Sequence, residues 1–393
     1  MNGPPWVTGL KAGGLKRLMI VSVLLVCLYL LAREGPAMIQ RFLFTLGDET
    51  APHVILVYLA DLNGDEHQDA FLVTNQMHRI VINDGTGNFT SGQELFMRNY
   101  ALALGDLDGN ESLDAVLLHF EDGERGGELI TECAEAPADF VIPARADGVP
   151  GQVFAVRDGN RDALPEGYVA GCCGGGTTMM NYATLFSKRR SCLGTKHPAA
   201  AALGDLNGDQ TLDVFIANSW MLVDGQPQSN TPNEVWFNDG LGNFTDSGQR
   251  LGDDQSFAVM LGDLNGDGFM DAVVGNQNGG EIWGNDGQGN FTKSNQRLGR
   301  RMANTIFLTD LDNDGDLDLF LGGNSSIRAW LNNGTGRFKS GQRIPFGYLE
   351  AISVGDVTGD GVVDVFVGGP DSYRVWRGDG NGRFSAEKSI AYR

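Results

Sequence analysis

Short apolar runs recur along the chain, each directly after a strongly polar loop. The runs read AFLVTN from Ala70, AVLLHF from Ala115, VFIAN from Val214, AVVGN from Ala272, LFLGGN from Leu319 and VFVGG from Val365. They are too short for typical helices, they contain β-branched and aromatic residues, and most end at Asn or Gly. This pattern predicts buried β-strands.

A hairpin signal follows most of these runs. It reads INDGTGNFT from Ile82, FNDGLGNFT from Phe237, GNDGQGNFT from Gly284, LNNGTGRFK from Leu331 and RGDGNGRFS from Arg377. Such Asn/Asp-Gly turns suit tight connections with positive φ angles. Another short strand precedes each polar loop, as in FAVMLGD from Phe257. One repeat therefore predicts about four strands in roughly 47 residues, the size of a propeller blade.

Four tryptophans stand at one equivalent position of the repeat, shortly before the hairpin turn: Trp236, Trp283, Trp330 and Trp376. A ring of aromatic side chains that binds a ligand is one interpretation. Packing between neighbouring blades is the preferred one, because the position recurs with the fold.

The polar loop itself is acidic and occurs in seven copies. Six read DLNGDEHQD from Asp61, DLDGNESLD from Asp106, DLNGDQTLD from Asp205, DLNGDGFMD from Asp263, DLDNDGDLD from Asp310 and DVTGDGVVD from Asp356. One gap between copies is about twice the usual period. DGNRDALPE from Asp158 divides this gap and keeps the same offsets.

Oxygen-bearing side chains stand at positions 1, 3, 5 and 9 of each loop, where a curled backbone can direct them to one point. Calcium prefers six to eight hard oxygen ligands, which these side chains, the position-7 carbonyl and a water would supply. The candidate ligands are Asp61, Asn63, Asp65, Asp69, Asp106, Asp108, Asn110, Asp114, Asp158, Asn160, Asp162, Glu166, Asp205, Asn207, Asp209, Asp213, Asp263, Asn265, Asp267, Asp271, Asp310, Asp312, Asp314, Asp318, Asp356, Thr358, Asp360 and Asp364.

Position 12 distinguishes these loops from EF-hands. An EF-hand needs a bidentate Glu there, whereas this chain has Leu, Val or Ile in every copy. A simple turn is the other interpretation of an Asp/Asn/Gly cluster. Seven copies in phase, each closed by an acid at position 9, favour a calcium loop followed at once by a β-strand.

The acidic loop, the strand after it and the NDGxGxF hairpin together resemble FG-GAP/VCBS repeats, the units of the propeller in integrin α-subunit heads. The resemblance covers roughly residues 50 to 390. It implies an all-β, seven-bladed β-propeller with up to seven Ca²⁺ ions, used for adhesion or recognition without catalysis. The loop at Asp158 departs from the pattern, with Glu166 as its last ligand and Pro165 before it, which leaves its metal occupancy open.

The N-terminal region carries an uncharged apolar run, LMIVSVLLVCLYLLA from Leu18, after Lys11, Lys16 and Arg17. The run is short for a spanning helix, which needs roughly 17 to 25 residues, and no clean signal-cleavage site follows it. We expect a cytoplasmic tail at 1–17, an uncleaved signal-anchor helix (or else a cleaved signal peptide) at 18–34, and a linker or closing strand at 35–50. The positive flank then places the propeller, 51–393, outside the cytoplasm, extracellular or periplasmic.

The repeat is interrupted in its second and third copies. The hairpin signal is absent there, which predicts irregular loops at 119–157 and 170–198. These loops hold Cys133, Cys172, Cys173 and Cys192, candidates for two disulfides in an exported chain. Cys172 and Cys173 are adjacent and are not expected to pair with each other. A zinc site is the less favoured alternative because no CxxC pair is present.

Composition narrows the function. The 56 glycines favour many turns over long helices. The net charge of −21 argues against a nucleic-acid partner. We therefore expect a recognition or scaffold module for a protein or glycan, attached to a membrane by its N-terminal segment. The alternative is a calcium-dependent polysaccharide-active enzyme, for which the acids between Glu121 and Glu135 are the only cluster outside the repeat loops.

Overall fold

The computed structural model divides the chain into two compact units, Met1–Pro52 and His53–Arg393. It describes residues 54–74, 77–95, 198–219, 221–223, 226–228, 232–240, 243–323, 325–347, 350–386 and 389–391, and it describes the strands between 99 and 181 by their backbone. The predicted tail, anchor and linker at 1–50 lie outside these residues.

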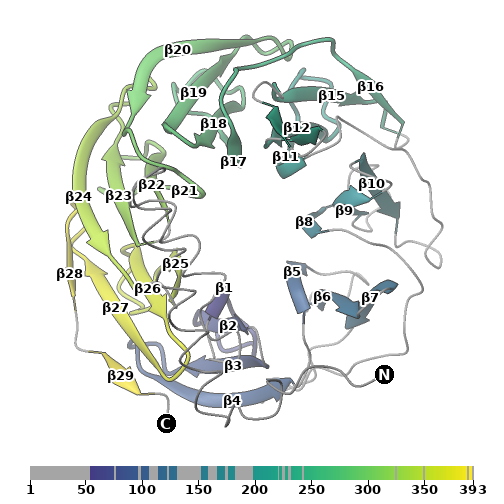
Figure 1. Ribbon diagram of the computed structural model, residues 1–393. Coiled ribbons are helices and arrows are strands. Elements are labelled where there is room, and N and C mark those ends of the chain that lie inside the picture. Colours follow the sequence, from purple (N-terminus) through teal and green to yellow (C-terminus); the bar gives the residue numbers. More distant parts are fainter. Residues whose placement is uncertain are drawn as a thin grey trace, which may run out of the picture. The chain divides into compact units, whose positions relative to one another are not determined.

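The described residues form antiparallel sheets in which consecutive strands are neighbours (Figure 1). Sheet 1 contains β1 (Val54–Ala60), β2 (Asp69–Thr74), β3 (His78–Asn83) and β4 (Phe89–Leu95). Sheet 2 contains β5 (Asn99–Gly105), β6 (Asp114–Glu121) and β7 (Glu124–Ile130). Sheet 3 contains β8 (Gln152–Arg157), β9 (Glu166–Cys172) and β10 (Gly176–Asn181). Sheet 4 contains β11 (Pro198–Gly204), β12 (Asp213–Asn218), β15 (Glu234–Asn238) and β16 (Phe244–Asp246).

The C-terminal sheets keep the same order. Sheet 5 contains β17 (Ser256–Gly262), β18 (Asp271–Asn276), β19 (Gly279–Asn285) and β20 (Phe291–Leu298). Sheet 6 contains β21 (Thr305–Thr309), β22 (Asp318–Gly323), β23 (Ser326–Leu331) and β24 (Lys339–Pro345). Sheet 7 contains β25 (Ala351–Gly355), β26 (Asp364–Gly368), β27 (Ser372–Gly378) and β28 (Phe384–Ala386), and β29 (Ile390–Ala391) also pairs with β27.

The second strand of each sheet is the predicted apolar run. Every residue of β2, β12, β18 and β26 is buried, because a neighbouring strand lies on each side and apolar residues cover both faces. Each second strand begins at position 9 of its acidic loop, including Asp114 in β6 and Glu166 in β9. The predicted change from loop to strand at this point is confirmed.

Apolar side chains fill the spaces between successive sheets. One cluster joins sheets 4 and 5 and includes Phe215, Val274 and Trp283. The next joins sheets 5 and 6, with Trp330 packed against it, and a third joins sheets 6 and 7, with Trp376 packed against it. Packing between neighbouring sheets is therefore confirmed for Trp283, Trp330 and Trp376, whereas Trp236 packs on residues of its own sheet.

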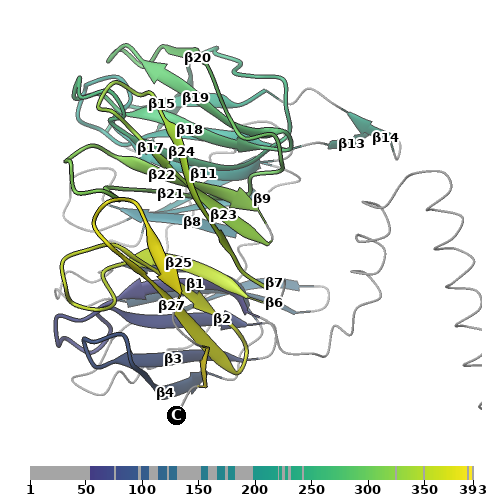
Figure 2. The ribbon, with the colours of Figure 1, turned by 90° about the vertical axis from the view of Figure 1, so that its left-hand side faces the viewer.

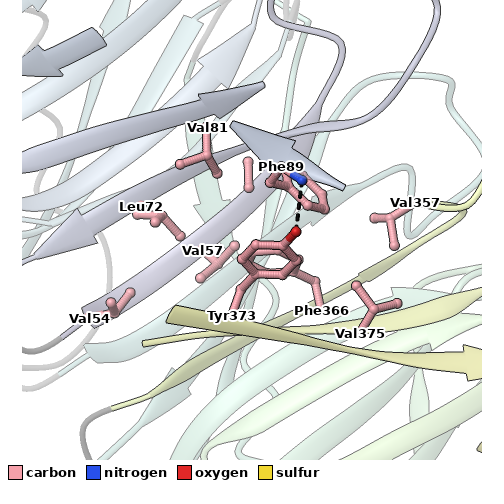
Figure 3. Close-up of a cluster of buried hydrophobic side chains, with 10 residues drawn as sticks. Val54, Val57, Leu72, Val81, Phe89, Val357, Phe366, Tyr373 and Val375 are labelled. Atoms are coloured by element: carbon pink, nitrogen blue, oxygen red, sulfur yellow. Dashed lines mark hydrogen bonds between the residues drawn. The ribbon is translucent and has the colours of Figure 1, made fainter. Parts of the chain in front are cut away.

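Sheets 1 and 7 pack on each other in the same way, although they stand at opposite ends of the repeat array (Figure 3). Val57 and Phe89 of sheet 1 share a cluster with Phe366 and Tyr373 of sheet 7, and the Phe89 N–H donates to the Tyr373 hydroxyl at 2.9 Å. The outer strands of sheet 7, β28 and β29, come from the C-terminal part of the chain. Described strands thus close the array by side-chain packing, and the N-terminal segment MIQRFLF lies outside the described residues.

The ranges 119–157 and 170–198, where irregular loops were predicted, also contain strands. Strands β7, β8 and β10 lie within them and pair with β6 or β9. Each pairing satisfies backbone N–H and C=O groups that the edge of a two-stranded ribbon would leave open. Sequence reasoning also missed a small hairpin, β13 (Met221–Val223) with β14 (Gln226–Gln228), which is inserted between β12 and β15 and projects from sheet 4 (Figure 2).

The part of the chain that the structure describes contains no helix, so none there could span a membrane.

Candidate metal-binding loops

The described acidic loops share one location in their sheets. Each connects the first strand to the second, so they begin at Asp61, Asp205, Asp263, Asp310 and Asp356 and lie at corresponding ends of sheets 1, 4, 5, 6 and 7. The copies at Asp106 and Asp158 lie outside the described residues, apart from the strand starts at Asp114 and Glu166.

The position-1 carboxylate organises each loop. In the first copy, Asp61 Oδ1 accepts hydrogen bonds from the N–H groups of Gly64 and Asp65, and Oδ2 accepts from Glu66 at 2.8 Å. The position-6 N–H donates to the position-1 carboxylate in the other four copies as well. The backbone therefore curls around an acid whose side chain points into the loop.

This curl requires left-handed backbone at positions 4 and 6. Gly64, Gly266 and Gly268 have φ angles of 78°, 76° and 85°. Glu66 and Gln210, at position 6, have positive φ angles of 69° and 68°, a backbone conformation that residues other than glycine rarely adopt. Asn313 likewise has a φ of 59° at position 4, so both positions turn left-handed whatever residue occupies them.

Positions 3 and 5 complete the inward-facing set. In the first copy, Asn63 Oδ1 accepts from the Asp65 N–H at 3.0 Å, while Asn63 Nδ2 donates to Asp65 Oδ2 at 2.9 Å. Asp65 Oδ1 accepts from the position-7 N–H of His67 at 2.9 Å. The corresponding bonds recur at Asn207 and Asp209. These side chains are thus held close together by the loop backbone before any ion is considered.

Position 9 has a second role that the sequence did not reveal. Asp213 has no exposed surface; its Oδ2 accepts from the Leu206 N–H at 3.0 Å and its Oδ1 from the Asn238 N–H at 2.8 Å. The acid therefore ties the start of the loop to the hairpin. Equivalent bonds are made by Asp69, Asp271, Asp318 and Asp364.

Burial shifts the titration of these closing acids. Desolvation raises the pKa of Asp69, Asp213 and Asp318 to about 6, against the opposing effect of their backbone hydrogen bonds. Carboxylates at positions 1 and 5 add to the rise in Asp69 and Asp213. Desolvation by burial also raises the pKa of Asp271 and Asp364. A nearby cation would favour the charged forms and reverse this trend.

Two loops bring carboxylate oxygens close enough to share one ion. Oxygens of Asp205, Asp209 and Asp213 all lie within 4.8 Å of one another, as do oxygens of Asp310, Asp312 and Asp314. Each carboxylate oxygen has two lone pairs, so a backbone bond does not exclude a metal ligand.

Position 3 carries the clearest sign of a missing partner. The Asp312 Oδ1 atom is buried without a hydrogen-bond partner among the described residues. Burial, followed by the charges of Asp314 and Asp310, raises the pKa of Asp312. Buried oxygens without partners are costly, and oxygen ligands are what calcium prefers. The residues present therefore fit a bound calcium ion.

An asparagine link that recurs between sheets was also missed by sequence reasoning, which treated this residue only as part of a turn. Asn285 Nδ2 donates to the Met270 carbonyl of its own loop and, at 2.9 Å, to the Leu206 carbonyl in the loop of sheet 4. Asn332 and Asn83 make the same bonds to the loops of sheets 5 and 7. The acidic loops are therefore part of the contact between sheets.

The architecture defines a class of all-β repeat protein in which each four-stranded unit carries one acidic loop. Comparison with protein families identifies it further: the FG-GAP-like repeat family matches residues 61–117, 205–274 and 310–367, and the FG-GAP repeat family matches 257–292. The chain is an FG-GAP repeat protein. A search of curated proteins found no match.

Solved structures with a similar fold are propeller-like and distant in sequence. A lectin of Agrocybe aegerita, which recognises non-reducing terminal N-acetylglucosamine, is 19% identical, with a TM-score of 0.57 over 86% of this chain and 94% of that one. A protein of unknown function from Desulfotomaculum acetoxidans is 12% identical, with a TM-score of 0.56 over 81% and 92%. BBS1N, solved in complex with ARL6DN, is 12% identical, with a TM-score of 0.52 over 88% and 96%. At these identities the likeness concerns the fold alone.

Proposed function

We propose that this protein is a seven-bladed propeller, stiffened by calcium in its acidic loops, that serves as a recognition or scaffold module outside the cytoplasm. The proposal of calcium binding rests on one observation. Carboxylate oxygens of Asp310, Asp312 and Asp314 lie close together, and the Oδ1 atom of Asp312 is buried without a hydrogen-bond partner among the described residues. The segment at 18–34 would anchor the protein to a membrane, and Cys133, Cys172, Cys173 and Cys192 would form two disulfides.

The chain's own residues explain what the ion would do. A calcium ion, when bound, neutralises carboxylates that otherwise repel one another. The position-1 and position-5 acids hold the loop backbone, and the position-9 acid ties that loop to the hairpin. Since Asn285 and Asn332 bond to the loop of the preceding sheet, order in each loop stabilises the contact between sheets.

Recognition is supported by the family and by the scaffold. FG-GAP repeats here build sheets with short connecting segments at their ends, where ligands of such repeat arrays bind. One fold neighbour is a lectin, which supports glycan binding as a use of this scaffold without naming the ligand.

Thermal unfolding of the full-length protein tests the calcium part. We expect a lower Tm in excess EDTA than in excess Ca²⁺, because one site at a free concentration of 100 Kd adds about 2.7 kcal/mol. Elemental analysis should find calcium, and Asp312→Ala, which removes the position-3 oxygens, should lose part of it. Exposed Asp253, in the β16–β17 connection, supplies the matched control Asp253→Ala. An unchanged Tm together with a metal-free protein would falsify the calcium proposal.

Two further assays address recognition. A glycan array and a pull-down on the intact protein should identify a partner whose binding is saturable. A turnover assay on polysaccharides separates this from the alternative, since product formation would instead support a calcium-dependent polysaccharide-active enzyme.

A further inference from the structure

Each of five sheets places a charged residue at the same point of its third strand, and four of them neutralise it. In sheet 1, Arg79 and Glu94 are cross-strand neighbours 3.1 Å apart. In sheet 4, Glu234 lies 4.0 Å from Arg250. In sheet 5, Glu281 is opposite Arg297 and lies 2.6 Å from Lys293, and in sheet 7, Arg374 pairs with Glu350.

Sheet 6 departs from this rule. Its third strand carries Arg328, and the residue directly opposite in β24 is Arg343. Like charges directly opposite each other destabilise a sheet, whereas opposite charges stabilise it. The described residues contain no carboxylate that forms an ion pair with either side chain. The fold therefore gains nothing electrostatically from this pair.

Both guanidinium groups are nevertheless held in place. Arg328 Nη1 donates to the Gly341 carbonyl at 2.9 Å, and Arg343 Nε donates to Ser326 Oγ at 2.8 Å. Each guanidinium has five N–H donors, so several remain available to a ligand. Arg343 is exposed and Arg328 is half-buried. The pair is thus positioned and accessible.

Two more arginines stand at the same end of sheet 6. Arg300 and Arg301 lie in the connection from β20 to β21, and both are exposed. This connection packs on sheet 6: a Cβ at Gly299 would lie 4.0 Å from Trp330, and the Asn304 N–H donates to the Gly322 carbonyl. In sheet 7 the corresponding connection supplies Glu350, which pairs with Arg374. Sheet 6 receives two further cations instead.

We propose that Arg300, Arg301, Arg328 and Arg343 form a binding site for an anionic saccharide bearing carboxylate or sulfate groups. This inference rests on the recognition role proposed above and names its ligand class. Arginine forks match the planar or tetrahedral oxygens of such groups in bidentate fashion. The site lies on a protein of net charge −21, but charges more than about 8–10 Å away are largely screened at physiological salt.

The surface favours a saccharide over a protein partner. Protein interfaces usually centre on large exposed apolar side chains. The exposed large apolar residues of the described chain are Leu56, Phe269 and Met270, and none of them belongs to sheet 6 or to the β20–β21 connection. A hydrophilic polyanion fits guanidinium groups without such an anchor.

Binding measurements on the full-length protein, at fixed free Ca²⁺, test the site. The probes are hyaluronan oligosaccharides, which carry carboxylates, and heparin-derived oligosaccharides, which carry sulfates, with neutral chitooligosaccharides, poly-glutamate and a DNA oligonucleotide for comparison. We expect at least one anionic saccharide to bind, and the two saccharide arms to show whether carboxylate or sulfate is preferred.

The decisive variant is Arg343→Glu. It should weaken anionic-saccharide binding about tenfold or more and also raise Tm, because Arg328 gains the opposite-charge neighbour that Arg79 has in sheet 1. A purely structural role for Arg343 would not produce loss of binding with higher stability. The double variant Arg300→Ser, Arg301→Ser changes two residues of an exposed connection. It should weaken anionic-saccharide binding without changing Tm, and it tests the site if Arg343→Glu fails to fold.

Arg250→Ser is the matched control, because Arg250 follows Gln249 after the outer strand of sheet 4 as Arg343 follows Gln342 in sheet 6, and because it pairs with Asp246. Unchanged binding in the sheet 6 variants, an equal loss in Arg250→Ser, or equally strong binding of poly-glutamate or DNA would overturn this site. Failure of both anionic saccharides also overturns it. The proposed recognition role is tested separately, by the array of neutral glycans and by the pull-down.

Discussion

The buried aspartate that closes each acidic loop serves both the fold and the candidate metal site. Asp271 is 2% exposed and accepts the N–H groups of Leu264 and Asn285, which belong to the loop and the hairpin. Desolvation raises its pKa, so the metal-free protein holds this charge at a cost. The same carboxylate can therefore report both on backbone order and on the presence of a cation.

Asp271→Ala should destabilise the protein strongly. It leaves two buried backbone N–H groups without acceptors, each costing about 1–3 kcal/mol. Urea unfolding should show this loss with EDTA as well as with Ca²⁺, because the backbone bonds exist in either condition. The exposed Asp253→Ala variant should change little. A loss confined to Ca²⁺ buffer would mean that metal binding alone requires the acid.

His78 makes stability depend on pH in the opposite direction from the closing acids. The side chain is fully buried, its Nδ1 accepts the Thr74 N–H at 3.4 Å, and burial lowers its pKa from 6.5 to about 4. Between these two values the unfolded chain binds more protons, so this contribution is complete above pH 6.5 and is lost as pH falls toward 4.

His78→Gln should remove that dependence. The contribution of His78 amounts to at most about 3.5 kcal/mol, since one pKa unit corresponds to about 1.4 kcal/mol. Urea unfolding at about pH 7 and about pH 5 should therefore show a smaller fall for the variant than for the natural protein. Equal falls in both proteins would contradict the assignment.

The sequence located the carboxylates of the loops but not how they are used. Spacing alone predicted that positions 1, 3, 5 and 9 converge, and the described copies place them in one loop. It could not show that Asp213 is buried and bound to Leu206 and Asn238, because those bonds depend on the hairpin returning to the loop. For the same reason Asn285 looked like a turn residue, since its partner Leu206 belongs to another sheet.

Successive sheets are also joined by a glutamine in or after the outer strand. Gln249, Gln296 and Gln342 each accept the N–H of a phenylalanine at, or directly before, the start of the outer strand of the next sheet. The Gln342 Nε2 group also donates to the Phe384 carbonyl at 2.7 Å. One glutamine amide therefore bonds both the N–H and the C=O of Phe384, as a residue of a neighbouring strand would. The outer edges of neighbouring sheets are thereby fixed to each other.

Gln342→Ala should lower the free energy of unfolding by about 1–3 kcal/mol, because the Phe384 N–H and C=O lose partners in a partly buried position. The exposed hairpin residue Gln288 provides the control Gln288→Ala. Thermal or urea unfolding of the two variants measures the difference. Equal stability of the two variants would show that packing, not these bonds, joins the sheets.

At the level of elements, sequence reasoning succeeded where the repeat is regular. Apolar runs and hairpin turns predicted the second, third and fourth strands of sheets 1, 5 and 6, and their bounds follow the loops. It failed at β7, whose sequence ERGGELI has no hairpin turn of the repeat type before it and still pairs with β6. Pairing there follows from the open edge of β6, which is a property of the neighbouring strand.

For the whole molecule, the contact between sheets 1 and 7 differs from every contact between consecutive sheets. Consecutive sheets are joined by the chain, whereas sheets 1 and 7 are held by the Phe89–Tyr373 contact (Figure 3) and by the Asn83–Val357 hydrogen bond. The sequence could not choose between a closing N-terminal strand and the C-terminal segment. Lys388 stands where the repeat has glutamine, and at this contact the Tyr373 hydroxyl accepts the phenylalanine N–H instead.

A matched pair of variants tests whether this closing contact opens before the others. Asn83→Ala removes the bond to Val357 across the closing contact, and Asn285→Ala removes the equivalent bond to Leu206 between consecutive sheets. Both should cost about 1–3 kcal/mol. Local opening should differ, however, because the chain joins sheet 4 directly to sheet 5, whereas among the described residues sheet 7 meets sheet 1 through noncovalent contacts.

Amide hydrogen exchange reads out this difference at two equivalent N–H groups. Phe89 donates across the closing contact to Tyr373, and Phe291 donates across the internal contact to Gln249. Asn83→Ala should accelerate exchange at Phe89 more than Asn285→Ala accelerates it at Phe291, since an untethered contact loses more order when one bond is removed. If both amides accelerate equally, the closing contact is as strong as a chain-linked one, and side-chain packing alone is enough to hold the first sheet to the last.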